Sequence, residues 1–226
     1  MIVKKYFDLS DRHHRTMHDM NIIRTVAVIG AGKGCGCTHF SIAYANYMRA
    51  MTGEKTALLM SGGNGYMNSI RSMCEVKEIA VSKRNMSSCI YGDCFEFYGI
   101  DYYSLTDDKR IETLFSNDYK HIIIDYGDKK DGISGDILLM TKRVVIGSLM
   151  PWKCKEFDSF CENNSTYINK ADWNFFMRNG EISDAKYFRD KYGIRIKKIP
   201  EFSNPYRIGK KEKDFFENEG RCIFCS

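Results

Sequence analysis

Residues 30–36 have the composition and spacing of a phosphate-binding loop. Four of these seven residues are glycines, and they lie between the apolar run 26–29 and an amphipathic helix pattern that begins near Cys37. Glycine lets the backbone turn so that consecutive N–H groups converge at the positive end of a helix dipole. A phosphate can accept those hydrogen bonds. The order of strand, glycine loop and helix therefore predicts an anion site before any side chain is considered.

The side chains of this segment match the usual loop sequence, G-x-x-x-x-G-K-[ST], only in part. Gly36 matches the last glycine and Thr38 matches the hydroxyl that binds Mg²⁺, but Cys37 stands at the lysine position. Donors to a phosphate are still expected from the backbone. The predicted nucleotide-binding residues of this segment are Lys33, Gly34, Cys35, Gly36, Cys37, Thr38 and His39.

An acidic residue ends a second apolar run. Residues 122–124 are three consecutive isoleucines, and Asp125 follows them. A buried parallel strand with this pattern presents its last carboxylate at the carboxyl edge of the sheet, where open α/β sheets bind ligands. Thr38 and Asp125 are therefore predicted to hold Mg²⁺, with the carboxylate acting through water.

Strands and helices that alternate along the chain must position these residues. The fold class expected is α/β, a three-layer sandwich with a mostly parallel central sheet. Glycines at 53 and 193 are expected to end helices, and Ser183 is expected to cap one. Helices are expected to begin near residues 37, 67, 106, 151 (with Pro151 as the first residue) and 183. Six or seven strands are expected, at 26–29, 56–60, 94–103, 121–127, 143–147, 173–177 and 194–200.

Length and composition favour one folded core. The chain has 226 residues, is 43% hydrophobic and carries a formal charge of +5, which is too small to indicate a nucleic-acid partner by itself. No apolar run approaches the roughly 18 to 20 residues that cross a bilayer. Nine scattered cysteines are expected to be reduced thiols in a cytoplasmic protein. We expect an extension over residues 1–23, one domain over 24–220 and a tail over 221–226.

With these motifs in place, the chain resembles the MinD/ParA branch of P-loop NTPases from about Arg24 to about Asn218, including the TadZ/CpaE-type localisation proteins of pilus assembly. Residues 32–39 lie over the family loop K-G-G-x-G-K-T-T, and residues 119–125 are similar to the strand Y-D-x-I-I-I-D. Residues 199–207 are similar to I-P-x-x-P-x-x-R. The resemblance implies the P-loop NTPase fold, ATP and Mg²⁺ as cofactors, and Asn179 and Pro200 near the base.

Departures from the family pattern concern the charged groups. The family's lysine that reaches across a dimer falls on Gly32, and its D-x-D after the second strand falls on Ser61 and Gly63. Because phosphoryl transfer depends on positioning and charge neutralisation, these losses predict weak or no ATP hydrolysis. The expected function is a degenerate, pseudo-ATPase scaffold or localisation factor for an assembly such as a pilus or secretion system.

Partners follow from the same resemblance. The expected partners are a nucleotide, a protein of the assembly or secretion machinery, and a second copy of the chain in a homodimer. Contact with DNA or with an anionic membrane, at the inner face of the membrane, would use a basic cluster near the carboxyl end. That cluster consists of Arg195, Lys197, Lys198, Arg207, Lys210, Lys211 and Lys213.

Three alternatives remain open on the sequence. The chain is an active ATPase if Lys33, or a lysine of a partner subunit, replaces the missing lysines. It is a structural module without a ligand if its glycines serve only the close packing of strand and helix. It binds zinc if Cys222 and Cys225, which have C-x-x-C spacing, meet a second cysteine pair.

Overall fold

The sheet of this protein has eight strands in the order β3-β4-β2-β5-β1-β6-β7-β8. A computed structural model describes residues 23–61, 67–72, 94–104, 114, 118–129, 133–168 and 172–224. Every pair of neighbouring strands is parallel except β3 and β4. The strands are β1 (Arg24–Gly30), β2 (Thr56–Met60), β3 (Cys94–Phe97), β4 (Ile100–Ser104), β5 (His121–Asp128), β6 (Lys142–Gly147), β7 (Trp173–Met177) and β8 (Ile196–Lys198).

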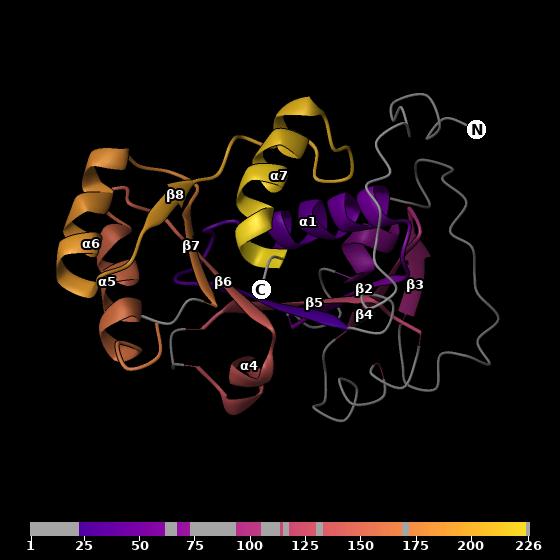
Figure 1. Cartoon of the computed structure of the whole chain (residues 1–226), viewed down its shortest axis with the longest axis horizontal. Helices are drawn as coiled ribbons and strands as arrows, with labels where there is room; N and C mark the ends of the chain where they lie inside the picture. Colours follow the sequence, from indigo (N-terminus) through magenta and orange to yellow (C-terminus); the bar gives the residue numbers. More distant parts are fainter. Residues whose placement is uncertain are drawn as a thin grey trace.

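Helices cover both faces of this sheet (Figure 1). α1 and α7 lie on one face, and α4, α5 and α6 pack on the other. The expected three-layer α/β architecture is therefore confirmed. Residues 67–72 are also helical. The labelled helices are α1 (Cys37–Thr52), α4 (Gly135–Leu139), α5 (Cys154–Asn163), the 3₁₀ turn η4 (Ile182–Asp184), α6 (Ala185–Tyr192) and α7 (Lys210–Phe224).

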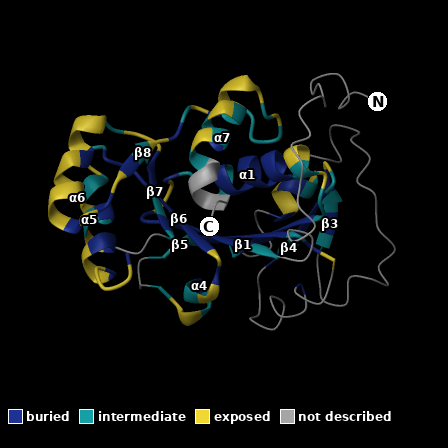
Figure 2. Ribbon diagram, viewed as in Figure 1, coloured by how far each residue is buried: buried dark blue, intermediate teal, exposed yellow. Residues whose placement is uncertain are grey.

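The middle of each central strand is a continuous apolar run because both faces of the sheet are buried there. In β1, Val26 and Val28 pack with α1 and α7, whereas Ala27 and Ile29 face the opposite layer. All four are buried, and Figure 2 shows the burial of the sheet against the exposed outer surfaces of the helices. A parallel sheet covered on both sides produces continuous apolar runs rather than alternation.

An aromatic stripe packs α1 against α7. Phe40, Tyr44 and Tyr47 pack on Phe216 of α7, with ring centroids 5.7, 5.6 and 4.9 Å from it. Gly53 ends the helix, as expected, with a φ of 67° and an N–H that donates to the Arg49 carbonyl. This packing sets the direction in which the amino end of α1 points.

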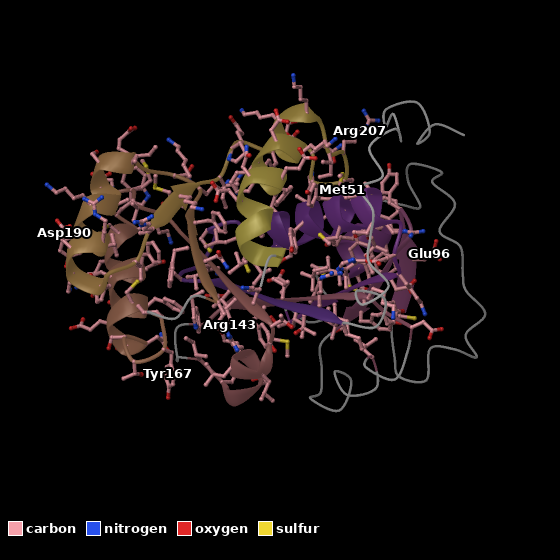
Figure 3. All side chains as sticks on the ribbon, in the orientation of Figure 1. Met51, Glu96, Arg143, Tyr167, Asp190 and Arg207 are labelled. Carbon is pink, nitrogen blue, oxygen red and sulfur yellow. The ribbon has the colours of Figure 1, made fainter. Side chains whose placement is uncertain are left out.

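A buried arginine fastens α4 below the sheet. Arg143, labelled in Figure 3, pairs with Asp172 and donates from Nε to the Ile137 carbonyl over 3.0 Å. Burial lowers the pKa of Arg143. The sequence analysis did not predict α4, which is only five residues long.

Three local predictions are wrong. Residues 94–104 form a hairpin rather than one strand, because Tyr98 and Gly99 adopt φ values of 53° and 75° and turn the chain; the sheet therefore has eight strands instead of the expected six or seven. Ser183 lies inside η4 instead of capping a helix, since Glu181 and Asp184 form the capping box. α5 begins at Cys154 rather than Pro151, because residues 151–153 form a turn in which the Lys153 N–H donates to the Met150 carbonyl over 2.7 Å.

Other expectations fall partly outside the described residues. The helix expected from residue 106 is described only at Leu114, which is helical and buried. Gly193 ends α6 with a φ of 72°, as expected. Cys94 is disulfide-bonded, so the expectation of reduced thiols is wrong there, whereas Cys35, Cys37, Cys154 and Cys161 are free. None of the described helices has the length and apolar character that a membrane crossing requires.

Candidate functional site

The glycine loop lies at the carboxyl end of β1, in the middle of the sheet. Ala31 donates to the Ile146 carbonyl of β6 over 2.9 Å, and Lys129, after β5, donates to the Gly30 carbonyl over 3.1 Å. Both neighbouring strands therefore hold the beginning of the loop. A glycine-rich segment at the carboxyl edge of a parallel sheet is placed where such sheets bind ligands.

The end of the loop opens the first turn of α1. Gly36 has a φ of 96°, which favours glycine, and no side chain caps the helix. The first intrahelical bond runs from the Phe40 N–H to the Gly36 carbonyl over 3.0 Å. The N–H groups of residues 37–39 thus have no backbone acceptor within the helix and lie at its positive end, although the Cys37 N–H also faces the Cys35 thiol. This is the geometry that binds phosphate in other proteins.

Cys37 faces inward and contacts Asp125. Its Sγ donates to Asp125 Oδ1 over 3.0 Å, and it also lies 3.4 Å from the Val28 carbonyl. Burial, followed by the nearby Asp125 charge, raises the pKa of the Cys37 thiol well above its usual value. The residue at the lysine position is therefore a neutral donor to the carboxylate.

Asp125 is buried at the end of β5, in register with Val28 of β1. Its Oδ1 also accepts from the Gly127 N–H over 2.9 Å. Among the described residues, none donates to Oδ2. Thr38 is half-buried in the first turn of α1. A hydroxyl and one carboxylate oxygen, completed by waters, form a donor set that suits Mg²⁺. The residues thus fit the metal predicted for them.

A pocket of about 300 Å³ lies on the α5 side of the loop. Glu156 Oε2 occupies the position that a Cβ on Gly32 would take. Lys153 Nζ donates to both Glu156 oxygens over 3.2 Å and to the Lys33 carbonyl over 3.0 Å. Asn179 also lines this pocket. The cation on this side is paired with a carboxylate, and a longer side chain at position 32 would have to displace Glu156.

A smaller pocket lies on the opposite side of the loop, against β7 and β8. Gly36, His39, Arg178, Pro200 and Phe202 contribute to it. The Cδ and Nη1 atoms of Arg178 lie 3.1 and 3.2 Å from the position of a Cβ on Gly36. The sequence analysis did not single out Arg178. Its only signal was its place at the carboxyl edge of the sheet, directly after β7.

His39 lines this smaller pocket. Its ring stacks on Phe202 with centroids 6.3 Å apart, and its Nε2 is buried without a hydrogen-bond partner. Burial, with a further contribution from the positive charge of Arg178, lowers the pKa of His39. The ring is therefore neutral near pH 7.

The structure brings the predicted loop residues, Thr38 and Asp125 to one edge of the sheet. Lys33 and Gly34 are exposed, Gly36 is half-buried, and Cys35 is buried with its pKa raised by that burial. The two residues predicted to lie near the nucleotide base line different pockets. Asn179 lines the pocket on the α5 side and Pro200 lines the smaller one.

Comparison by sequence with protein-family models and with curated proteins gives no match. Solved structures do match. A putative plasmid partition protein of Borrelia burgdorferi bound to AMPPNP superposes with a TM-score of 0.61 at 14% identity, covering 89% of this chain and 98% of that one. The chain has the ParA/MinD P-loop NTPase fold.

Two further structures with this fold agree. One is the MinC:MinD cell division protein complex of Aquifex aeolicus, with a TM-score of 0.53, 13% identity and coverage of 85% and 86% of the two chains. The other is a ParA family ATPase of Chlorobium tepidum, with a TM-score of 0.51, 13% identity and coverage of 80% and 85%. At this level of identity, the likeness concerns the ParA/MinD fold and not the chemistry of the site.

Proposed function

We propose that this chain is a nucleotide-binding protein of the ParA/MinD fold that hydrolyses ATP slowly or not at all. It would use its fold and its bound nucleotide as a scaffold or localisation factor. The observation that carries the proposal is the loop itself. Its backbone donors lie at the open amino end of α1, while Cys37 at the lysine position donates to Asp125 instead of reaching outward.

The argument for binding rests on the backbone. Residues 34–38 would donate N–H groups to the phosphates, and Thr38 with Asp125 would hold Mg²⁺. Mg²⁺ would neutralise part of the phosphate charge. The Borrelia protein is bound to AMPPNP, which makes ATP the nucleotide to test first.

The argument against hydrolysis rests on the missing charges. Cys37 replaces the lysine that would stabilise charge on the transferred phosphoryl group, and Ser61 replaces the first aspartate after β2. Ser61 donates its backbone N–H to the Asp125 carbonyl over 2.8 Å and offers no carboxylate to orient an attacking water. Gly63 lies outside the described residues. Removal of such groups lowers phosphoryl-transfer rates by orders of magnitude.

We further propose a protein partner from an assembly machinery, a pilus or secretion system of the kind that TadZ/CpaE-type proteins serve, in the cytoplasm or at the inner face of the membrane. A protein partner is supported by MinD of Aquifex aeolicus, which forms a complex with MinC. A homodimer is the second expected association. The predicted DNA or membrane contact has weaker support. Lys197 pairs with Glu219, and Lys213 pairs with Glu217 over 3.5 Å, so α7 neutralises part of the basic cluster.

Equilibrium binding of ATP combined with phosphate release tests this function. We expect saturable, Mg²⁺-dependent binding of ATP and phosphate release no faster than that of an Asp125→Asn variant. The Asp125→Asn variant keeps the size of the side chain and removes the charge that would hold the metal. Absence of ATP binding would refute the nucleotide site, and Asp125-dependent hydrolysis at ordinary ATPase rates would refute the scaffold function.

A further inference from the structure

We propose that Arg178 supplies the positive charge that the loop lacks and binds the phosphates of the nucleotide beside Gly36. This inference rests on the proposed function, since it requires a nucleotide in the loop. It adds a residue to the site that the loop sequence alone does not contain.

The position of Arg178 is the first step. Arg178 directly follows β7, and its backbone N–H donates to the Gly147 carbonyl of β6 over 3.1 Å. Its side chain then extends to Gly36, where Cδ and Nη1 would lie 3.1 and 3.2 Å from an added Cβ. The guanidinium therefore rests beside the last glycine of the loop, one residue before the amino end of α1.

The charge of Arg178 is the second step. Within the described part of the chain, no carboxylate lies within ion-pair distance of its guanidinium, and the side chain is exposed. Lys153, a cation on the other side of the loop, shares its charge with Glu156 over 3.2 Å. An unpaired guanidinium next to a row of backbone donors creates a stronger attraction for an anion than a neutralised pair does.

The surroundings of Arg178 are the third step. Pro200 and Phe202 provide apolar surface in the same pocket, and the buried His39 Nε2 has no partner there. A nucleotide whose phosphates meet Gly36 and Arg178 would present its sugar or base to this surface. Arginine suits this role because its planar group can form two parallel hydrogen bonds with phosphate oxygens.

Equilibrium dialysis of ATP, ADP and adenosine against four proteins tests the inference. The proteins are the unmodified chain, Arg178→Gln, Arg178→Lys and Arg189→Ala. Arg189 is an exposed arginine on α6, so its removal changes the net charge equally. Gln keeps much of the arginine's length without its charge, and thermal unfolding shows that each variant is folded.

We expect Arg178→Gln to weaken ATP and ADP binding by about 10- to 100-fold, the range for a lost charge-assisted hydrogen bond. Adenosine binding should stay unchanged, Arg178→Lys should retain part of the affinity, and Arg189→Ala should match the unmodified chain. An ATP affinity of Arg178→Gln within about threefold of the unmodified chain would overturn the inference while leaving the nucleotide site standing. An equal loss for adenosine would also overturn it. Absence of ATP binding by the unmodified chain would refute both proposals.

Discussion

The two sides of the glycine loop differ in how their charges are arranged. On the α5 side, Lys153 lies between Glu156 and the Lys33 carbonyl, so the cation and the carboxylate neutralise each other. On the β7 side, Arg178 lies against Gly36, and none of the carboxylates that the structure describes forms an ion pair with it. The same backbone loop thus has one neutralised side and one basic side.

This difference indicates on which side of the loop a bound anion would be stabilised most. A paired cation near the surface contributes little to the field at the loop, because its partner cancels it and water screens the remainder. An unpaired guanidinium beside backbone donors adds directly to their attraction. We therefore expect anion binding to depend on the conformation of Gly36 and on Arg178 more than on Lys153. Four sets of substitutions test this comparison.

Gly36→Val should have the largest effect. A valine would have to adopt a φ of 96° and its Cβ would crowd the Arg178 side chain, at a cost of about 1 to 3 kcal/mol in the free energy of unfolding. Urea unfolding and ATP titration should show both the lost stability and the lost binding. Gly34→Val is the matched control, because Gly34 also has a positive φ of 74° and would be strained in the same way, but an added Cβ there meets only open space. Equal loss of ATP binding in both variants would contradict the special role of Gly36.

Cys37→Val should lower the free energy of unfolding by about 1 to 3 kcal/mol, because it leaves the buried Asp125 carboxylate without the thiol donor. Chemical denaturation measures this change. Cys37→Ser restores a donor at the same position and should recover most of the stability. If valine proves as stable as cysteine, the contact between Cys37 and Asp125 does not stabilise the edge of the sheet.

Glu156→Gln should tighten ATP binding by a few fold, because it removes the charge that neutralises Lys153 beside the loop. Lys153→Met, in which the cation is removed instead, should weaken ATP binding by no more than a few fold. Both affinities come from the same titration at low salt. A loss of affinity in Lys153→Met as large as that expected for Arg178→Gln would reverse the comparison between the two sides.

His39 should give the smallest effect, a dependence of stability on pH. Its pKa is lowered in the folded protein, so protonation favours the unfolded state. The contribution of His39 to the free energy of unfolding is fully present above its unfolded pKa of about 6.5. It declines as the pH falls below that value. His39→Asn should flatten the slope of unfolding free energy against pH below about pH 6.5. An unchanged slope would show that the ring is not desolvated.

The sequence predicts more of the fold than of the candidate site. Strands 56–60 and 173–177 have the predicted bounds. A strand that is buried on both faces is a continuous apolar run, which can be recognised in the sequence. Residues 94–104 were misjudged because their apolar pattern continues through a turn in which Tyr98 itself has a positive φ. The backbone loop was predictable from its glycines. The place of Arg178 beside Gly36 was not, because it depends on how β7 and β1 are ordered across the sheet.

The central claim is that the backbone of the loop binds phosphate while the side chains that would catalyse ATP hydrolysis are absent. The most direct measurement is the NMR shift of backbone amides on addition of Mg²⁺ and ATP, followed over hours by the phosphorus spectrum. We predict saturable shifts concentrated at residues 34–39 together with the Arg178 side chain, while the ATP phosphorus signals persist. Unchanged amides in this loop at saturating ATP, or rapid conversion of ATP to ADP and phosphate, would contradict the account.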